Sequence, residues 1–406
     1  MWAMDLGYGA MSSVATSLRV PGFARLAGSY TVNELGDNIG VVALAILVLD
    51  RTGYVMAPVA LFLSARLLPA LLAPVLTARL DRVALRRVLP PLYLGEAAAF
   101  ALLAVTTRHF WLPAVLVLAL VDGVIAVTAR GLTRGAVATL LIPAGMLREG
   151  NATINVGFAV ASAAGPALGG LIVAAWGPGV ALIVDAVSFL LVAVLLVGHG
   201  HEPSEEASVA GWRERVSEGV QAVSSRPVLR RLVIAEAVGF VIFTIATPIE
   251  IVYVKRSLDA GDLAYGALLS AWGVGILAGS GVFAQLRHRP LPTVLAASTV
   301  AVGLAFLGFA GANSIVVACA AAFVGGLGNG VQWVAFLTLI QEQVPEGLQA
   351  RVMGLLESMG AAMPGLGFIA GGVMAAVWNP RVAFAVAGAA ALCLAIAFLQ
   401  RGEAGP

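Results

Sequence analysis

Glu34 and Asp37 are acidic residues inside a long apolar stretch near the start of the chain. Because they are three residues apart, they share one face of a helix. A charge at the centre of a bilayer costs about 2.5–3.5 kcal/mol. Dehydration favours the protonated form of a carboxyl and a nearby cation favours its ionised form, so the predicted chemistry is reversible proton binding. The alternative is a permanent ion pair or hydrogen bond between helices that does not titrate.

Arg130, Glu236 and Gln332 are further polar residues at a similar depth. Glu34 and Arg130 stand about 11 and 10 residues above the inner boundaries of their segments, on the order of 16 Å at 1.5 Å per residue. Glu236 and Gln332 follow those two residues at an offset of 202. We therefore predict Glu34 or Asp37 as the proton carrier, Arg130 as its modulating partner and Glu236 as a second acid.

The segments that position these residues belong to an internal repeat. Residues 1–200, moved forward by 202, fall into register with the second half without a gap. The clearest matches pair Gly169-Gly170, Trp176 and Pro178 with Gly371-Gly372, Trp378 and Pro380. A fixed long period in an apolar chain indicates two copies of one membrane module, an arrangement typical of transporters.

The composition places the module in lipid. Hydrophobic residues make up 60% of the chain and charged residues 11%, with a mean hydropathy of +0.95, which excludes an ordinary soluble domain. A spanning helix needs about 20 apolar residues, and twelve stretches qualify. They are 23–49, 55–78, 88–107, 111–140, 150–175, 179–198, 229–254, 263–285, 291–310, 313–341, 352–376 and 379–400.

The basic residues predict the topology. With both termini in the cytoplasm, basic residues at the segment ends favour the inside by about three to one. Trp111, Trp176 and Trp378 then fall at outer boundaries, where indole rings favour the interface. We expect an N-terminal six-helix bundle at 1–200, a cytoplasmic linker with an amphipathic helix at 201–228, and a C-terminal six-helix bundle at 229–406.

Three motifs resemble the major facilitator superfamily, and within it the drug:proton antiporter branch that includes macrolide and enterobactin exporters. One is Gly36-Asp37 in the first helix. The second is the loop from Thr77 to Arg87, which contains Asp81-Arg82 and Arg86-Arg87. The third is Gly165-Pro166-Ala167-Leu168-Gly169-Gly170 in the fifth helix, followed by Asp185 to Phe189 in the sixth. The resemblance covers essentially the whole chain and implies an all-α membrane fold of twelve helices in two pseudo-symmetric bundles.

The resemblance also implies roles for these residues. In the resembled fold, helices 1, 4, 7 and 10 line a central cavity, which would bring Glu34, Arg130, Glu236 and Gln332 around one chamber. The loop with Asp81, Arg82, Arg86 and Arg87 would act as a gating latch; the alternative is a plain cytoplasmic anchor. Gly165, Pro166, Gly169 and Gly170 would seal the path, or else form a tight helix contact without coupling.

Other intramembrane residues have less defined roles. Asp122, Glu96, Asp185, Glu250, Glu357, Arg66 and Arg134 are expected to pack or pair between helices, or to face the vestibules. Aromatic residues are candidates for a wall that accommodates a substrate, with Trp333 beside Gln332 as the first choice. The others are Phe23, Tyr30, Phe158, Phe240, Phe243, Trp272 and Phe336.

The expected function is secondary transport. The chain has no nucleotide-binding Gly-Lys loop, no HExxH pair and no GxSxG elbow, so we expect no enzyme activity, no cofactor, no metal and no nucleic acid partner. The prediction is a monomeric exporter of drug-like or amphiphilic molecules in the cytoplasmic membrane, driven by protons and working by alternating access. The alternatives are export or flipping of an endogenous amphiphile, such as a siderophore or lysophospholipid, and import by proton symport.

Overall fold

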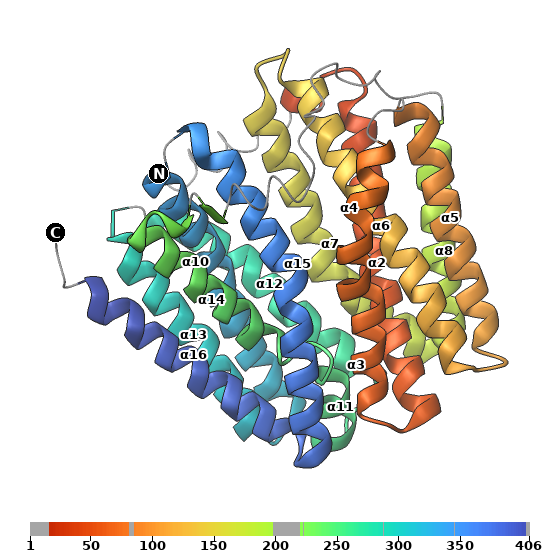
Figure 1. The fold of residues 1–406 in the computed structure, drawn as a ribbon. Helices are drawn as coiled ribbons and strands as arrows, with labels where there is room; N and C mark the ends of the chain where they lie inside the picture. Colours follow the sequence, from red (N-terminus) through yellow and green to blue (C-terminus); the bar gives the residue numbers. More distant parts are fainter. Residues whose placement is uncertain are drawn as a thin grey trace, which may run out of the picture. The chain divides into compact units, whose positions relative to one another are not determined.

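The computed structural model describes residues 16–80, 85–197, 220–221, 223–286, 288–344 and 346–402, which are helical and contain no strand. Figure 1 shows their arrangement. The first half contains α2 (Phe23–Thr52), α3 (Met56–Phe62), the π-helix η1 (Leu63–Leu67), α4 (Leu68–Leu80), α5 (Leu85–Thr106), α6 (Leu112–Leu141), α7 (Leu147–Trp176) and α8 (Pro178–Leu196).

The second half also has six segments, but its first segment is divided rather than its second. It contains α10 (Pro227–Thr244), α11 (Glu250–Val252), the π-helix η2 (Tyr253–Ser257), α12 (Asp262–Gln285), α13 (Leu291–Gly311), α14 (Ile315–Gln343), α15 (Glu346–Val377) and α16 (Pro380–Gly402). Counting α3–η1–α4 and α10–α11–η2 as one segment each, the described residues form twelve segments. Ten of these contain a stretch long and apolar enough to cross a membrane, and α16 contributes the shorter apolar stretch Pro380–Ile396.

The predicted continuous helix at 229–254 is wrong. Helix α10 ends at Thr244, and residues 245–249 form turns before α11 begins at Glu250. Pro248 explains the end of the helix, because it has no N–H to donate to the carbonyl of Thr244, four residues earlier. The repeat partner of Pro248 is Ile46, which lies inside α2, so the first copy continues without a break.

The tight turn between α7 and α8 shows how the repeat fixes local structure. Gly177 has φ +83° and leads directly into Pro178 at the first position of α8. Glycine adopts this backbone conformation without a steric penalty, and proline is favoured at a helix start. In the second copy Asn379 stands in place of Gly177, and its side-chain oxygen accepts a hydrogen bond from the Val382 N–H at 3.1 Å. Both sequences therefore end one helix and start the next within three residues.

The chain forms two compact units. The first comprises Met1–Leu44 and Leu68–Ser208, and the second comprises Ala45–Leu67 and Val209–Pro406. Within the first unit α5 lies beside α8, and within the second α13 lies beside α16 (Figure 1). Residues 45–67 belong to the first sequence repeat but pack in the second unit. Residues 201–219 of the expected linker lie outside the described part of the chain.

Candidate functional site

The first unit brings together Glu34 and Asp37 of α2 with Arg130 of α6. Arg130 Nη1 lies 3.6 Å from Glu34 Oε1 and 3.8 Å from Asp37 Oδ2. The Glu34 side chain is only 3% exposed, whereas that of Arg130 is 33% exposed. Asn33 Nδ2 donates to Asp37 Oδ2 at 3.3 Å. One guanidinium thus lies within ion-pair distance of two carboxylates and can stabilise the ionised form of either.

Three further acids lie behind this group in the same unit. Glu96 of α5 and Asp185 of α8 are fully buried. Asp122 of α6 has a buried carboxylate oxygen without a hydrogen-bond partner. Glu96, Asp122 and Asp185 all lie within electrostatic range of Asp37. The expectation that these acids pack between helices fits their burial, but three residues on separate helices carry no sequence signal that they meet.

The second unit holds the repeat partners differently. Glu236 of α10 is partly exposed, and among the described residues no ion pair reaches it. Gln332 of α14 donates from Nε2 to Thr299 Oγ1 of α13 at 2.9 Å. The adjacent Trp333 is 47% exposed, and its ring meets the Phe240 ring edge-on with centroids 6.4 Å apart. Polar residues at repeat-related positions therefore have different partners in the two units.

Several aromatic residues proposed for a substrate wall are core residues. Phe23, Tyr30 and Phe336 are 0%, 5% and 1% exposed. Phe243 and Trp272 join a cluster around Phe306 at centroid distances of 6.3 and 5.9 Å. Trp333, with Phe240, keeps an exposed face. Phe158 is 43% exposed on α7. The first three aromatics stabilise the interior rather than line a surface.

The predicted seal in the fifth helix is a backbone-to-backbone contact. A Cβ atom added at Gly165 would overlap Asn38 of α2, and one added at Gly169 would lie 3.1 Å from the Ile39 backbone. Gly170 and Pro166 are also buried in α7. Small residues permit this approach of two helices. The described structure supports the tight contact; whether it couples to transport stays a prediction.

The predicted cytoplasmic latch falls largely outside the described residues. Asp81 and Arg82 are not described, and the same holds for the side chain of Arg86. Arg87 is exposed on the first turn of α5. Its gating role remains a prediction.

A separate set of contacts joins residues 45–67 to the rest of the second unit. Lys255 Nζ lies 2.6 Å from Asp50 Oδ1 and 2.7 Å from Asp262 Oδ1. Arg256 donates to the carbonyl of Gly53. Partial burial disfavours the charge on Lys255, but its hydrogen bonds to Asp262 and Asp50 raise its pKa above the usual 10.5. This network therefore keeps its cation throughout the physiological pH range.

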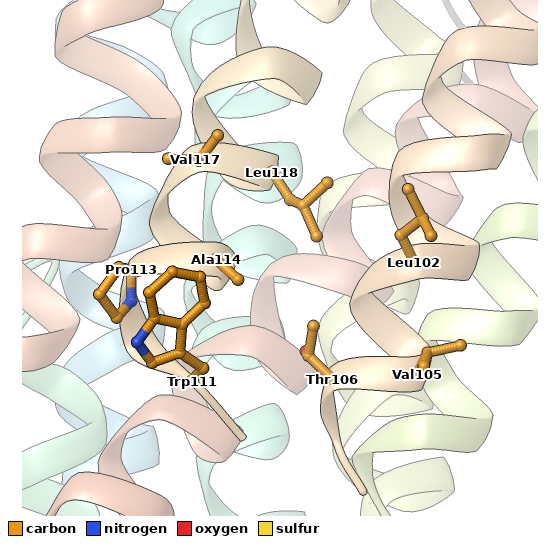
Figure 2. Close-up of a pocket in the computed structure, with 8 residues that line it drawn as sticks. All are labelled: Leu102, Val105, Thr106, Trp111, Pro113, Ala114, Val117 and Leu118. Atoms are coloured by element: carbon orange, nitrogen blue, oxygen red, sulfur yellow. The ribbon is translucent and has the colours of Figure 1, made fainter. Parts of the chain in front are cut away.

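An apolar groove of about 440 Å³ lies between the end of α5 and the start of α6, as Figure 2 shows. Its wall includes Leu102, Val105 and Trp111, which are 54–65% exposed. Thr106 is its most polar residue. The groove is lined by apolar residues and contains none of the charged residues above.

Comparisons with known proteins identify the fold and its relatives. Residues 12–402 match the family described as transmembrane secretion effector. The MFS-type transporter YfiS of Bacillus subtilis is 26% identical over 237 residues, which cover 55% of this chain and 56% of that protein. The multidrug efflux pump Tap of Mycobacterium tuberculosis H37Rv is 26% identical over 355 residues, 83% of each chain.

Solved structures resemble the whole fold. The nucleoside transporter NupG aligns with a TM-score of 0.75 at 14% identity, covering 95% of this chain and all of that one. The human organic anion transporter MFSD10 aligns with a TM-score of 0.63 at 19% identity, covering 93% and 100%. At these identities the likeness supports the fold alone.

Proposed function

Because the chain belongs to the transmembrane secretion effector family of the major facilitator superfamily, we propose that it exports drug-like or amphiphilic small molecules in exchange for protons. Family membership makes it a multi-pass membrane transporter rather than an enzyme. We also propose that protons drive the export, that both termini lie in the cytoplasm and that the protein is a monomer.

The observation that carries the proposal is the arrangement of Arg130 between Glu34 and Asp37. When either acid is ionised, the guanidinium stabilises it; when a proton or a cationic substrate neutralises the acid, that attraction is lost. A proton and a cationic substrate therefore compete for the same carboxylates. Alternating access would let the site load a proton from one side of the membrane and release it on the other. The name of the relative Tap, a multidrug efflux pump, supports drug-like substrates.

The test is a drug-susceptibility panel in a host that lacks its own efflux pumps. We expect the wild-type chain to raise resistance to at least one amphiphilic cation, and Glu34→Gln and Asp37→Asn each to lower it. Asp259→Asn is the matched control, because Asp259 is an exposed acid in a loop with φ 48°, which asparagine also adopts. If both intramembrane variants export with a normal pH dependence, the carrier assignment is wrong.

Inverted membrane vesicles decide the direction and the substrate class. If the protein exchanges drug for protons, adding the exported drug outside vesicles with an acidified interior should release protons from them. Proton movement together with the drug, in the same direction, would instead identify symport. Translocation of a lysophospholipid headgroup without any change in drug resistance would replace the drug with an endogenous lipid as the substrate.

A further inference from the structure

Glu96 and Asp185 are two fully buried acids that the mechanism above does not use. They come from α5 and α8, and neither forms an ion pair within the described residues. Both carboxylate oxygens of Glu96 lack a hydrogen-bond partner, as does Oδ2 of Asp185. Leaving an ionised carboxylate in such surroundings is far more costly than neutralising it with a proton.

The Asp185 carboxyl lies directly against the turn of α2 that carries Asp37. A Cβ atom added at Gly36 or at Gly40 would overlap a carboxylate oxygen of Asp185. Ser188 donates to Asp185 Oδ1 at 3.2 Å, and the Phe100 ring approaches the same point at Gly40. The two glycines therefore leave a recess on α2 that the carboxyl fills.

Glu96 lies one helical turn before Phe100 on α5, so the two residues share a face. Glu96 lies within electrostatic range of Asp122, Asp37, Arg130 and Asp185. Asp37 therefore interacts both with the buried acids Glu96 and Asp185 and, by ion pairing, with Arg130.

The described charges of this cluster do not balance if all of its acids are ionised. Arg130 is within ion-pair distance of Glu34 and Asp37, and among the described residues Glu96, Asp122 and Asp185 form no ion pair. Unpaired buried anions cost several kcal/mol each, and bound protons would remove this cost.

We propose that Glu96 and Asp185 form a second proton-binding site, which exchanges protons with Asp37. The proposal rests on the proposed proton coupling and deepens it. In the exchange step, the proton leaves the carboxyl of Asp37 and joins the carboxylate of Glu96 or Asp185, so the net charge of the cluster is unchanged. Asp37 is then free to pair with Arg130 while the proton stays in the unit. The first unit consequently binds up to two protons more than Glu34 and Asp37 bind by themselves.

The groups that face this site define its titration. They are Asp37 from α2, Tyr93 from α5, and Asp122 and Arg130 from α6; Glu34 reaches them through its ion pair with Arg130. The described acid of α7, Glu149, lies in the first turn of that helix. A change at Asp37 should therefore alter proton binding at Glu96 and Asp185.

Infrared spectroscopy of the purified protein tests the proposal without substrate or gradient. During a pH titration we expect C=O bands of buried protonated carboxyls, one lost in Glu96→Gln and another in Asp185→Asn. Asp37→Asn should shift the titration of both, and Asp259→Asn should shift neither. The wild-type protein must itself show at least two such bands. The wild-type spectrum therefore tests the proposal even if a variant fails to fold.

Two results would overturn the site. If neither variant removes a band, Glu96 and Asp185 are both ionised or do not exchange protons with Asp37. If the bands persist at every pH and ignore Asp37→Asn, the protons are fixed and structural. Loss of drug export in Glu34→Gln tests the proposed function separately, so a failure of one proposal is distinguishable from a failure of the other.

Discussion

At the scale of residues, the first unit places Arg130 beside two carboxyls, Glu34 and Asp37, with Glu96, Asp122 and Asp185 within electrostatic range of Asp37. The spacing of Glu34 and Asp37 placed them on one helix face, and the structure adds the reach of Arg130 from α6 to both. Neither distance is that of a close bidentate pair, so the attraction is shared between two acids. Because both acids share one cation, the ionisation of each acid depends on whether the other is ionised.

Removing Arg130 should expose this dependence. We expect Arg130→Leu to lower thermal stability in detergent, because it leaves buried carboxylates without a cation. Adding Asp37→Asn should restore part of the loss, with a coupling free energy of about 0.5–3 kcal/mol in a double-mutant cycle. The measurement is the unfolding midpoint of the four proteins. Strictly additive effects would mean that Arg130 and Asp37 do not interact.

At the scale of elements, close helix contacts occur in both units, but in different registers. Gly169 contacts Ile39 and Val42 of α2, whereas Gly367 contacts Val241 and Thr244 of α10, the repeat partners of those two residues. Gly367 is itself the repeat partner of Gly165. Helix α15 therefore packs on α10 one turn, about 5.4 Å, away from the register of α7 on α2.

Bulky replacements at these contacts should be destabilising. A Cβ at Gly169 would lie 3.1 Å from the Ile39 backbone, and one at Gly371 would overlap the Ile245 carbonyl. We expect Gly169→Leu and Gly371→Leu each to cost about 1–3 kcal/mol of stability, measured as a lower melting temperature, and to reduce export.

Gly281→Leu is the matched control for both variants. Gly281 lies in α12 and has open space around an added Cβ. Its replacement should leave melting temperature and export close to wild type. Equal losses in all three variants would contradict a specific role for the close contacts.

At the scale of the whole molecule, residues 45–67 change partners relative to the sequence repeat. Asp50 comes from the first repeat and binds Lys255 in the second. Such exposed pairs contribute only about 0.2–1 kcal/mol, so their role in stability is small. If residues 45–67 move with the rest of the first repeat during transport, this contact breaks and re-forms in each cycle.

Locking the contact should stop transport. We would replace Cys319 and Cys393 with alanine, introduce Asp50→Cys and Lys255→Cys, and join the thiols with a short reducible cross-linker. Export should fall on cross-linking and recover after reduction, while each single-cysteine protein should be unaffected by the reagent. Undiminished export in the cross-linked protein would mean that the contact stays closed throughout the cycle.

The Lys255 contact should also be insensitive to pH in the working range. Its raised pKa means that the stability from the lysine charge is complete below pH 10.5 and is lost only as the pH rises past the folded-state value. Between pH 5 and about 9 we therefore expect the loss of melting temperature caused by Lys255→Met, relative to the wild-type protein, to stay constant. A loss that disappears as the pH rises toward 9 would contradict the assignment.

The sequence by itself predicted the membrane class, the twelve segments, the repeat and the superfamily, and the family match confirms the superfamily and the membrane class. Apolar runs and their period report what each helix must bury, so they require no knowledge of its neighbours. The sequence also placed Glu34 and Asp37 on one face, since helical spacing is local.

Only the tertiary structure decided which helices those faces meet. Rotation and tilt of one helix against another depend on packing between residues far apart in the chain, which no local pattern encodes. This is why Glu96, Asp122 and Asp185 gather near Asp37 unforeseen, why Gln332 bonds Thr299, and why residues 45–67 join the second unit. Pro248 is visible in the sequence and could have predicted the break. A hydropathy average over about twenty residues is not sensitive to one missing backbone N–H.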